Sequence, residues 1–415
     1  MTIYKKYPNG LRLVIEKMEG LMSVSCGVIV KTGSANETEL DNGISHFIEH
    51  VMFKGTKKRS AFEISDYIDR IGAQINAFTS KELTCYYTKS TYEHTVECLE
   101  VLSDIFFNSQ FLEEELEKEK GVILEEISMS EDTPEDLLFD LLSQSYFGNK
   151  GLGQTILGPA QNIKKFTRSD IKTYMDKFYT ADNVIISVAG NVNVEQTQKY
   201  IEEVFVNNFS YQVGHKYQET SPCKPQNLFK QKSIEQSHIG LCMPSFAVND
   251  DRSDALAIAN IVLGGGMSSR LFQTIRERLG LAYSVYSYSS LYQGQGILEV
   301  YAGVNPTQRD MAVDKIIEEI KNLKKDGVTE QEFLRAKEQI KSSIILGRES
   351  TSSQMILSAK YILFLEKTFD FNERLKAVNN LTIKQVNDAI DNSFDLTKLS
   401  TATVGPKGEC LSYKI

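Results

Sequence analysis

The sequence predicts an α+β protein made of two homologous domains, each a mostly antiparallel sheet with helices packed on one face. The first observation is an internal repeat, because residues 166–171 resemble residues 381–386. Each copy is followed by a helix and by an apolar strand that ends at a glycine, Gly190 or Gly405. The spacing from 166 to 381 equals the spacing from 190 to 405, and both are close to half of the chain, which indicates a duplicated domain.

The second observation is the order of strand and helix patterns within each half. Apolar runs typical of strands stand before and after helical hairpins, and many tight turns separate them, which favours antiparallel pairing. The periodic patterns stop between residues 207 and 227, where runs with Gly and Pro break them. We therefore predict a first domain at 1–210, a linker at 211–227 and a second domain at 228–415. His215, in the linker, is expected to be solvent-exposed.

Composition agrees with a large globular protein and excludes several classes of partner. The chain is 41% apolar and 24% charged, and its length is enough for two or three domains with ample core. A net charge of −9 without any basic run argues against nucleic acids and anionic membranes as partners. The six cysteines are scattered without a Cys-x-x-Cys pair, so we expect reduced thiols.

The N-terminal residues lack the apolar core of a signal peptide and lead into a predicted hairpin turn at Asn9-Gly10. No segment approaches the roughly 20 consecutive apolar residues that a membrane span needs. The expected location is therefore the cytoplasm.

The run from Gly43 to His50 is expected to be helical and carries His46, Glu49 and His50. At about 100° per residue, Glu49 and His50 project within about 60° of His46, so two imidazoles and a carboxylate share one side of the helix. The opposite side carries the apolar residues expected to anchor the helix, which are Ile44, Ile48 and Val51.

This order of residues, His-x-x-Glu-His, is the inverted form of the zinc-peptidase helix motif. The two histidines can share a tetrahedral zinc ion, and Glu49 can take a proton from a zinc-activated water, whose pKa falls to about 7. The alternative is a surface helix with two solvated histidines, but two of only five histidines stand here with an acid between them. The motif indicates hydrolysis of peptides.

The acidic helix expected at residues 111–127 offers a third zinc ligand. On a helical wheel Glu126 lies about 20° from Glu119, whereas Glu125 points elsewhere. Both Glu119 and Glu126 fall on a stripe of apolar residues, namely Leu112, Leu116, Val122, Ile123 and Ile127. Because a carboxylate on a buried stripe must be paired or bind a metal, we expect Glu126 to be the third ligand and Glu119 to orient a ligand or hold a proton. The alternative is a hydrated groove between helices that tolerates both glutamates.

With these residues in place, the chain resembles the pitrilysin and insulin-degrading enzyme superfamily. The residues that carry the resemblance are His46-x-x-Glu49-His50 and, well downstream in the acidic helix, Glu126. The resemblance covers essentially the whole chain and is strongest to bacterial, half-length relatives of the β subunit of the mitochondrial processing peptidase. It implies a zinc metalloendopeptidase with one zinc ion per chain.

A second signature of the resemblance lies at residues 72–87. Alternating side chains predict a strand, and Ser80-Lys81-Glu82 predicts the turn of a hairpin. The resemblance implies that this strand is a sheet edge beside the metal, to which a peptide adds as an extra strand through main-chain bonds. The substrate-binding residues expected there are Gln74, Asn76, Ala77 and Phe78. Taken alone, the alternation favours a plain half-buried hairpin.

A third signature lies at residues 269–283. In relatives, an arginine and a tyrosine seven residues later reach the substrate from the far half of the protein, and here these are Arg276 and Tyr283. A guanidinium and a phenol can bind peptide carbonyls, and the phenol can donate to the tetrahedral oxyanion. The alternative is an exposed arginine at a helix end and a tyrosine that packs in a sheet.

Full-length relatives join four such domains into a closed chamber, so a chain with two domains implies a homodimer or a heterodimer with a paralogue. The glycines at 264–266 end a helix and lack the Gly-Lys-Ser/Thr of a phosphate loop. The chain also lacks the long glycine-rich insertion that noncatalytic processing-peptidase subunits carry near this place. A noncatalytic scaffold subunit and a peptide-binding module remain alternatives, but the retained zinc residues and Glu49 argue against both.

Overall fold

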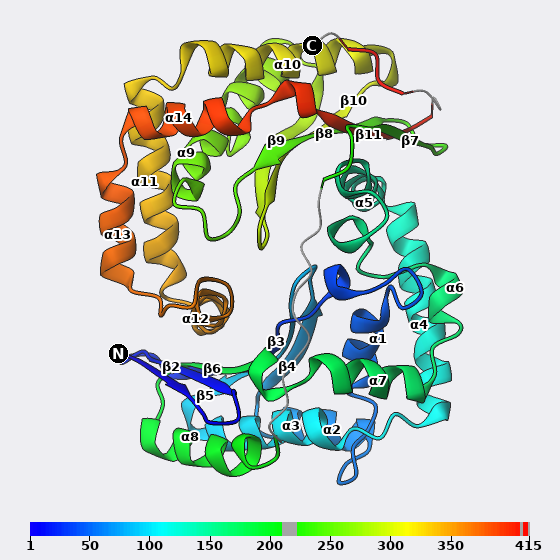
Figure 1. Cartoon of the computed structure of the whole chain (residues 1–415), viewed down its shortest axis with the longest axis vertical. Helices are drawn as coiled ribbons and strands as arrows, with labels where there is room; N and C mark the ends of the chain where they lie inside the picture. The colour runs from blue at the N-terminus through cyan, green and yellow to red at the C-terminus, as the bar shows by residue number, and fades with distance from the viewer. Residues whose placement is uncertain (210–221, 407–409, 414–415) are drawn as a thin grey trace. The chain divides into compact units, whose positions relative to one another are not determined.

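The computed structural model describes residues 1–209, 222–406 and 410–413, which form two compact units (Figure 1). Among these residues, the first unit contains 1–127, 154–209 and 346–369. The remaining described residues form the second unit. Each unit is therefore discontinuous in sequence and has its own sheet and core.

The first unit contains a six-stranded sheet in the order β1-β2-β6-β3-β5-β4. Its strands are β1 (Thr2–Lys6), β2 (Arg12–Lys17), β3 (Ser23–Val30), β4 (Gln74–Thr79), β5 (Thr84–Thr91) and β6 (Val184–Gly190). Only β2 and β6 pair in parallel; all other pairs are antiparallel. The turn between β1 and β2 contains Gly10 at a φ of +98°, which confirms the hairpin predicted at Asn9-Gly10.

The second unit contains a five-stranded sheet in the order β7-β11-β8-β10-β9. Its strands are β7 (Asn227–Gln231), β8 (Ser237–Ser245), β9 (Ala282–Leu291), β10 (Gly296–Val304) and β11 (Ser400–Gly405). Strands β7 and β11 pair in parallel, and the other pairs of this sheet are antiparallel. The parallel pair of β7 and β11 corresponds to the parallel pair of β2 and β6 in the first sheet. Without β1, the first sheet has the same order and the same pairing senses, so the two units are homologous α+β domains, as predicted.

The predicted constant offset between the two copies is visible in the helices. Helix α7 (Arg168–Phe178) and helix α14 (Ile383–Ser393) differ by this offset at both ends. Each begins with a capping box, in which the threonine at the N-cap, Thr167 or Thr382, bonds the backbone of the third helical residue and that residue's side chain bonds back. The repeat that a short stretch of sequence indicates therefore includes the capping box at the start of each helix.

Helices cover one face of each sheet, as expected. The other helices of the first unit are α1 (Ile44–Val51), α2 (Ala61–Arg70), α3 (Thr95–Asn108), α6 (Ala160–Ile163) and α8 (Val194–Ile201), with most of α4 (Glu113–Asp132). Those of the second unit are α9 (Ser253–Gly264), α10 (Arg309–Asp326), α13 (Phe371–Asn380) and most of α11 (Glu330–Gly347). Helix α9 ends at the glycines of 264–266, as predicted.

The opposite face of each sheet also carries one helix, which the sequence does not predict. In the first unit, α12 (Thr351–Leu365) packs on β2, β3 and β6, and in the second, α5 (Pro134–Phe147) packs on β7, β8 and β11. Each of these helices comes from the opposite half of the sequence. The division at 211–227 stays a prediction, because residues 210–221, with His215, lie outside the described part of the chain. The predicted domains also do not include the exchange of α5 and α12 between the units.

The exchanged helix of the first unit lies so close to β3 that a side chain at one position would collide with a side chain of α12. A Cβ atom on Gly27 would overlap the sulfur of Met355 in α12. In the second unit a Cβ atom on Gly240 of β8 would lie 3.0 Å from a methyl of Leu142 in α5. Both sheets thus use a glycine where the exchanged helix crosses.

Replacing Gly27 with valine is expected to lower the free energy of unfolding by about 1–3 kcal/mol, because the added methyl groups must displace the buried side chain of Met355 or shift α12 itself. Chemical denaturation of the full chain measures this loss. Gly121→Ala is the control: Gly121 lies within α4 with nothing within 4 Å of an added Cβ. That change should be neutral or stabilise by up to about 1 kcal/mol. Equal stability of Gly27→Val and the native chain would contradict the close approach.

All six cysteines are free thiols, and three of them, Cys26, Cys85 and Cys242, lie buried in strands. No helix in the described part of the chain is both long and apolar enough to cross a membrane.

Candidate metal centre

Helix α1 is held in the core of the first unit by the residues that its periodicity predicts. Ile44, Ile48 and Val51 are each at most 2% exposed, and Phe47 is fully buried beside them. His46 is 7% exposed, whereas Glu49 and His50 are half-buried. The apolar face therefore fixes the helix, and the polar face is left at the edge of the core, where ligands can reach it.

The structure brings His46, His50 and Glu126 together. One donor atom from each lies within 4.8 Å of the other two, and no other such group of His, Cys, Asp or Glu occurs in the described residues. Oε2 of Glu126 lies 3.6 Å from Nε2 of His46 and 3.4 Å from Nε2 of His50. Two imidazole nitrogens and one carboxylate oxygen form a donor set that peptidases use for catalytic zinc, with room for a fourth ligand.

The protonation of His46 suits this role. Burial, assisted by the neighbouring His50, lowers the pKa of His46 to about 3. The imidazole is therefore neutral near pH 7, which is the form that binds a metal. The residues present thus fit a zinc ion.

Glu119 lies behind His50, as its place on the wheel suggested. Its Oε2 is 3.2 Å from Nδ1 of His50 and its Oε1 is 2.7 Å from Nζ of Lys54, with Glu119 only 5% exposed. Burial tends to raise the pKa of Glu119, but the hydrogen bonds from His50 and Lys54 outweigh it and lower that pKa. An ionised Glu119 that accepts from Nδ1 leaves Nε2 of His50 free to face Glu126.

The same contacts act on His50 itself. Burial, the largest single influence, lowers the pKa of His50, but the hydrogen bond to Glu119 and the carboxylates of Glu126 and Glu49 together raise it.

Lys54, the second partner of Glu119, was not predicted from the sequence. Its signal is its place four residues after His50, on the continuation of the same helix side.

Glu49 points to the end of β4. Its carboxylate accepts a hydrogen bond from the hydroxyl of Thr79, the last residue of that strand. Burial raises the pKa of Glu49, and the bonds from Thr79 only partly oppose that effect. A carboxylate with a raised pKa is a more effective base near neutral pH. Thr79 was also missed, although it ends the strand predicted to bind substrate.

Helix α4 confirms the stripe only in part. Leu116 and Ile123 are fully buried, but Leu112 and Val122 are each 50% exposed, so the apolar face is narrower than predicted. A single helix packed on a convex core buries only the residues near the middle of its stripe. The side chain of Glu126 is 42% exposed at the border of this face, and Glu125 points to solvent.

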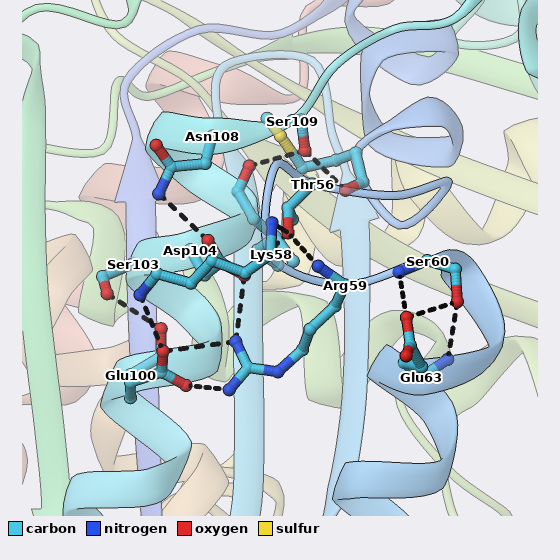
Figure 2. A network of polar contacts seen from close by, with 12 residues as sticks. Thr56, Lys58, Arg59, Ser60, Glu63, Glu100, Ser103, Asp104, Asn108 and Ser109 are labelled. Atoms are coloured by element: carbon cyan, nitrogen blue, oxygen red, sulfur yellow. Dashed lines mark hydrogen bonds and ion pairs between the residues drawn. The ribbon is translucent and has the colours of Figure 1, made fainter.

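The loop that carries Lys54 is bound to α3 by a polar network (Figure 2). The guanidinium of Arg59 contacts Glu100 at 2.7 Å and Asp104 at 3.0 Å, and Asp104 also accepts a bond from the hydroxyl of Thr56 at 2.8 Å. Asp104 is 1% exposed. A buried carboxylate with a guanidinium and a hydroxyl as partners ties the loop that follows Lys54 to α3.

Strand β4 is an edge strand, as the resemblance implies, since β5 is the only strand it pairs with among the described residues. Gln74 and Asn76 are exposed on it, while Ala77 and Phe78 are half-buried, and the ring of Phe78 packs against Tyr87 at 6.3 Å. The backbone N–H of Ala77 donates to the side-chain oxygen of Asn76 at 2.8 Å. Helix α1 lies against this strand, so the free edge and the three metal donors belong to one unit.

Arg276 and Tyr283 belong to the second unit and lie together. The guanidinium of Arg276 is 4.6 Å from the centre of the Tyr283 ring. Tyr283 is 78% exposed at the start of β9, which is the edge strand of its sheet. The alternative of a tyrosine packed within the sheet is therefore wrong.

The second unit holds no comparable group of metal donors. Among the described residues, His46, His50 and Glu126 are the only set of three His, Cys, Asp or Glu donors that lie close enough to share an ion. The two units share a fold, but the donor set belongs to the first alone.

Comparison with known proteins agrees with this division. Residues 12–160 match the family model described as insulinase (peptidase family M16), and residues 165–340 match the model described as peptidase M16 inactive domain. A Bacillus subtilis protein described as uncharacterized zinc protease YmxG is 43% identical over 96% of this chain and 97% of its own length. An uncharacterized zinc protease of Rickettsia felis is 35% identical over 97% of each chain.

Solved structures show the same fold. A protease from Helicobacter pylori superposes with a TM-score of 0.90 at 24% identity, covering 98% of this chain and 99% of that one. A peptidase M16 inactive domain protein from Pseudomonas fluorescens superposes with a TM-score of 0.91 at 17% identity over 100% of both chains. With relatives this similar along nearly the whole sequence, the resemblance to the insulin-degrading enzyme superfamily is confirmed: the chain belongs to peptidase family M16.

Proposed function

We propose that the chain is a zinc-dependent endopeptidase that hydrolyses peptides or unfolded protein segments bound as an added strand on β4. The observation that carries this proposal is the convergence of His46, His50 and Glu126 beside Glu49, whose carboxylate is held at the end of a free sheet edge. One zinc ion per chain is expected, because only one such donor group occurs in the described residues.

In this proposal His46, His50 and Glu126 hold the metal, and Glu119 with Lys54 keeps the His50 ring in its binding orientation. When bound, zinc lowers the pKa of a water molecule and polarises the peptide carbonyl. Glu49 takes the proton from the attacking water and delivers it to the leaving amine. Its hydrogen bond from Thr79 holds the carboxylate at the end of β4, beside the peptide that pairs with this strand.

Substrate recognition rests on the backbone of β4. A peptide that pairs with this edge gains main-chain hydrogen bonds that do not depend on its side chains, which gives loose sequence preference. A substrate carbonyl takes the N–H of Ala77 by displacing the side chain of Asn76. The side chains of Gln74 and Phe78 border the bound peptide along the same edge.

The test is a peptide-library digest by the purified protein, with and without a chelator, together with its metal content. Cleavage that disappears with the chelator and returns with zinc supports the proposal. A zinc-loaded protein that binds peptides without cleaving them would instead identify a peptide-binding module, and a protein that neither holds zinc nor cleaves would identify a scaffold subunit.

We also propose that Arg276 and Tyr283 bind the substrate from the second unit, at the metal site either of their own chain or of a partner chain. Their guanidinium and phenol, presented together on an exposed edge, bind carbonyls of the peptide, and the phenol donates to the oxyanion. Full-length relatives of the resembling superfamily use four domains, so the chain is expected to pair as a homodimer or with a paralogue, and its expected location is the cytoplasm.

Replacing Tyr283 with phenylalanine is expected to lower kcat by about 10²–10³ without loss of zinc, because an oxyanion donor disappears while the ring remains. Steady-state cleavage of a quenched peptide and metal analysis of the same sample measure both quantities. Tyr92→Phe is the control, since Tyr92 is a partly exposed tyrosine of the first unit outside the proposed site. An unchanged kcat in Tyr283→Phe would remove the second unit's tyrosine from the mechanism.

A further inference from the structure

Glu37 places a buried carboxylate at the N-terminal end of α1. The residue is 6% exposed. Its Oε2 accepts hydrogen bonds from the backbone N–H of Gly43 at 2.7 Å and from the side-chain amide of Asn42 at 2.8 Å. Its Oε1 accepts from the backbone N–H of Ser45 at 2.8 Å. Three hydrogen-bond donors therefore converge on one carboxylate that precedes the motif in sequence and lies outside the helix itself.

The start of α1 needs such a partner because its N-cap cannot supply one. Gly43 occupies that position with a left-handed φ of +99° and has no side chain to accept a bond. A larger residue does not fit, since a Cβ atom there would lie 2.7 Å from the carbonyl oxygen of Leu157. The first N–H groups of a helix are unsatisfied without a cap, and buried ones are costly. Glu37 thus replaces the missing cap from a more distant point in the chain.

A second chain of bonds fixes the same helical turn from another side. The hydroxyl of Ser45 is 2.8 Å from that of Tyr174, which is in turn 2.8 Å from the hydroxyl of Thr32. Tyr174 lies in α7 and Thr32 follows β3. Ser45 directly precedes His46, so its backbone and its side chain are both tied to fixed groups.

The position of this turn decides whether the metal donors meet. His46 and His50 lie on α1, but Glu126 lies on α4, so a small rotation or slide of α1 moves both imidazoles away from the carboxylate together. We propose that Glu37 is a positioning residue for the metal centre, which sets the rotation and height of α1 so that His46 and His50 meet Glu126. This inference rests on the proposed zinc site.

The experiment compares Glu37→Gln with Glu63→Gln in the full-length chain. Glutamine at 37 keeps the size of the side chain but replaces one accepting oxygen with an NH₂ group, which then faces an N–H donor. Glu63 is the matched control: it also accepts a backbone N–H at a helix start, from Ser60 at 2.8 Å, but on α2, which carries none of the three metal donors. Figure 2 shows this second cap.

Zinc affinity is measured by competition with a chromophoric chelator, and the free energy of unfolding of the metal-free protein by chemical denaturation. Glu37→Gln is expected to weaken zinc binding by about 10–100-fold, the range seen when a residue that orients a metal ligand is changed. Glu63→Gln is expected to leave zinc affinity unchanged and stability nearly so, since glutamine also completes a capping box, as Gln385 does in α14. Equal zinc affinity in Glu37→Gln and the native chain would overturn the role of Glu37.

Should Glu37→Gln not fold, Glu37→Asp tests the same role, because it keeps the carboxylate but shortens the side chain that reaches Gly43 and Ser45. A loss of zinc affinity of several-fold supports the inference, and an unchanged affinity contradicts it. Failure of the native chain itself to bind zinc would refute the proposed metal centre and this role with it, whereas native binding with unchanged variants refutes the positioning role alone.

Discussion

Glu49→Gln is expected to lower kcat by at least about 10²–10⁴ while the protein keeps its zinc and still binds peptides. Glutamine has the size of glutamate and can still accept the bond from Thr79, but it cannot take a proton from water. The loss therefore falls on the chemical step and not on binding, so KM should change far less than kcat. Cleavage of a quenched peptide, with metal analysis of the same sample, measures the effect.

Glu125→Gln is the control for this variant, because Glu125 is an exposed carboxylate of α4. Its turnover should equal that of the native chain. Near-normal turnover in Glu49→Gln would mean that another group acts as the base. A variant that binds without cleaving would also capture substrates from a peptide mixture, which would identify the preferred sequences.

His50→Ala is expected to remove the zinc and with it all activity, because a site with three protein ligands loses a large share of its affinity with each one. The change also leaves Glu119 without its imidazole partner, although Lys54 still contacts that carboxylate. Metal content after dialysis against a weak chelator is the direct measurement. Full retention of zinc by the variant would rule out His50 as a ligand.

The same assay separates two adjacent glutamates. Glu126→Gln should lose most of the metal affinity, since Oε2 of Glu126 lies within 3.6 Å of both imidazoles. Glu125→Gln should keep it. The opposite result would mean that α4 presents a different face to α1 in the metal-bound protein.

The donor set could be predicted from sequence because its geometry is local. His46, Glu49 and His50 share one side of a single helix, and helical periodicity alone fixes that relation. Glu126 could be predicted because a carboxylate on an apolar stripe must be paired with another group or bind a metal. The edge position of β4, in contrast, depended on the family resemblance, since alternation does not distinguish an edge strand from an inner one.

Lys54, Thr79 and Glu37 could not be predicted because their roles depend on tertiary contacts. Lys54 reaches Glu119 only because the loop after α1 is fixed to α3, and Thr79 reaches Glu49 because α1 lies against β4. Glu37 acts across a turn that no periodic pattern describes. Likewise, the apolar faces of α5 and α12 indicate that each helix is buried, but they do not indicate which sheet covers it.

The exchange of α5 and α12 also affects folding during synthesis, because the first unit cannot complete its fold until α12 has left the ribosome. The strands of the first sheet are complete at Gly190, but α12, which covers one of their faces, ends only at Leu365, in the last quarter of the chain. At synthesis rates of about 5–20 residues per second, this interval is on the order of 10 s. Throughout it the apolar face that packs against α12, which includes Val14, Ile29 and Ile185, has no cover from that helix. The N-terminal unit therefore cannot be released as a finished domain before the C-terminal half is nearly made, and the nascent chain is open to aggregation for that time.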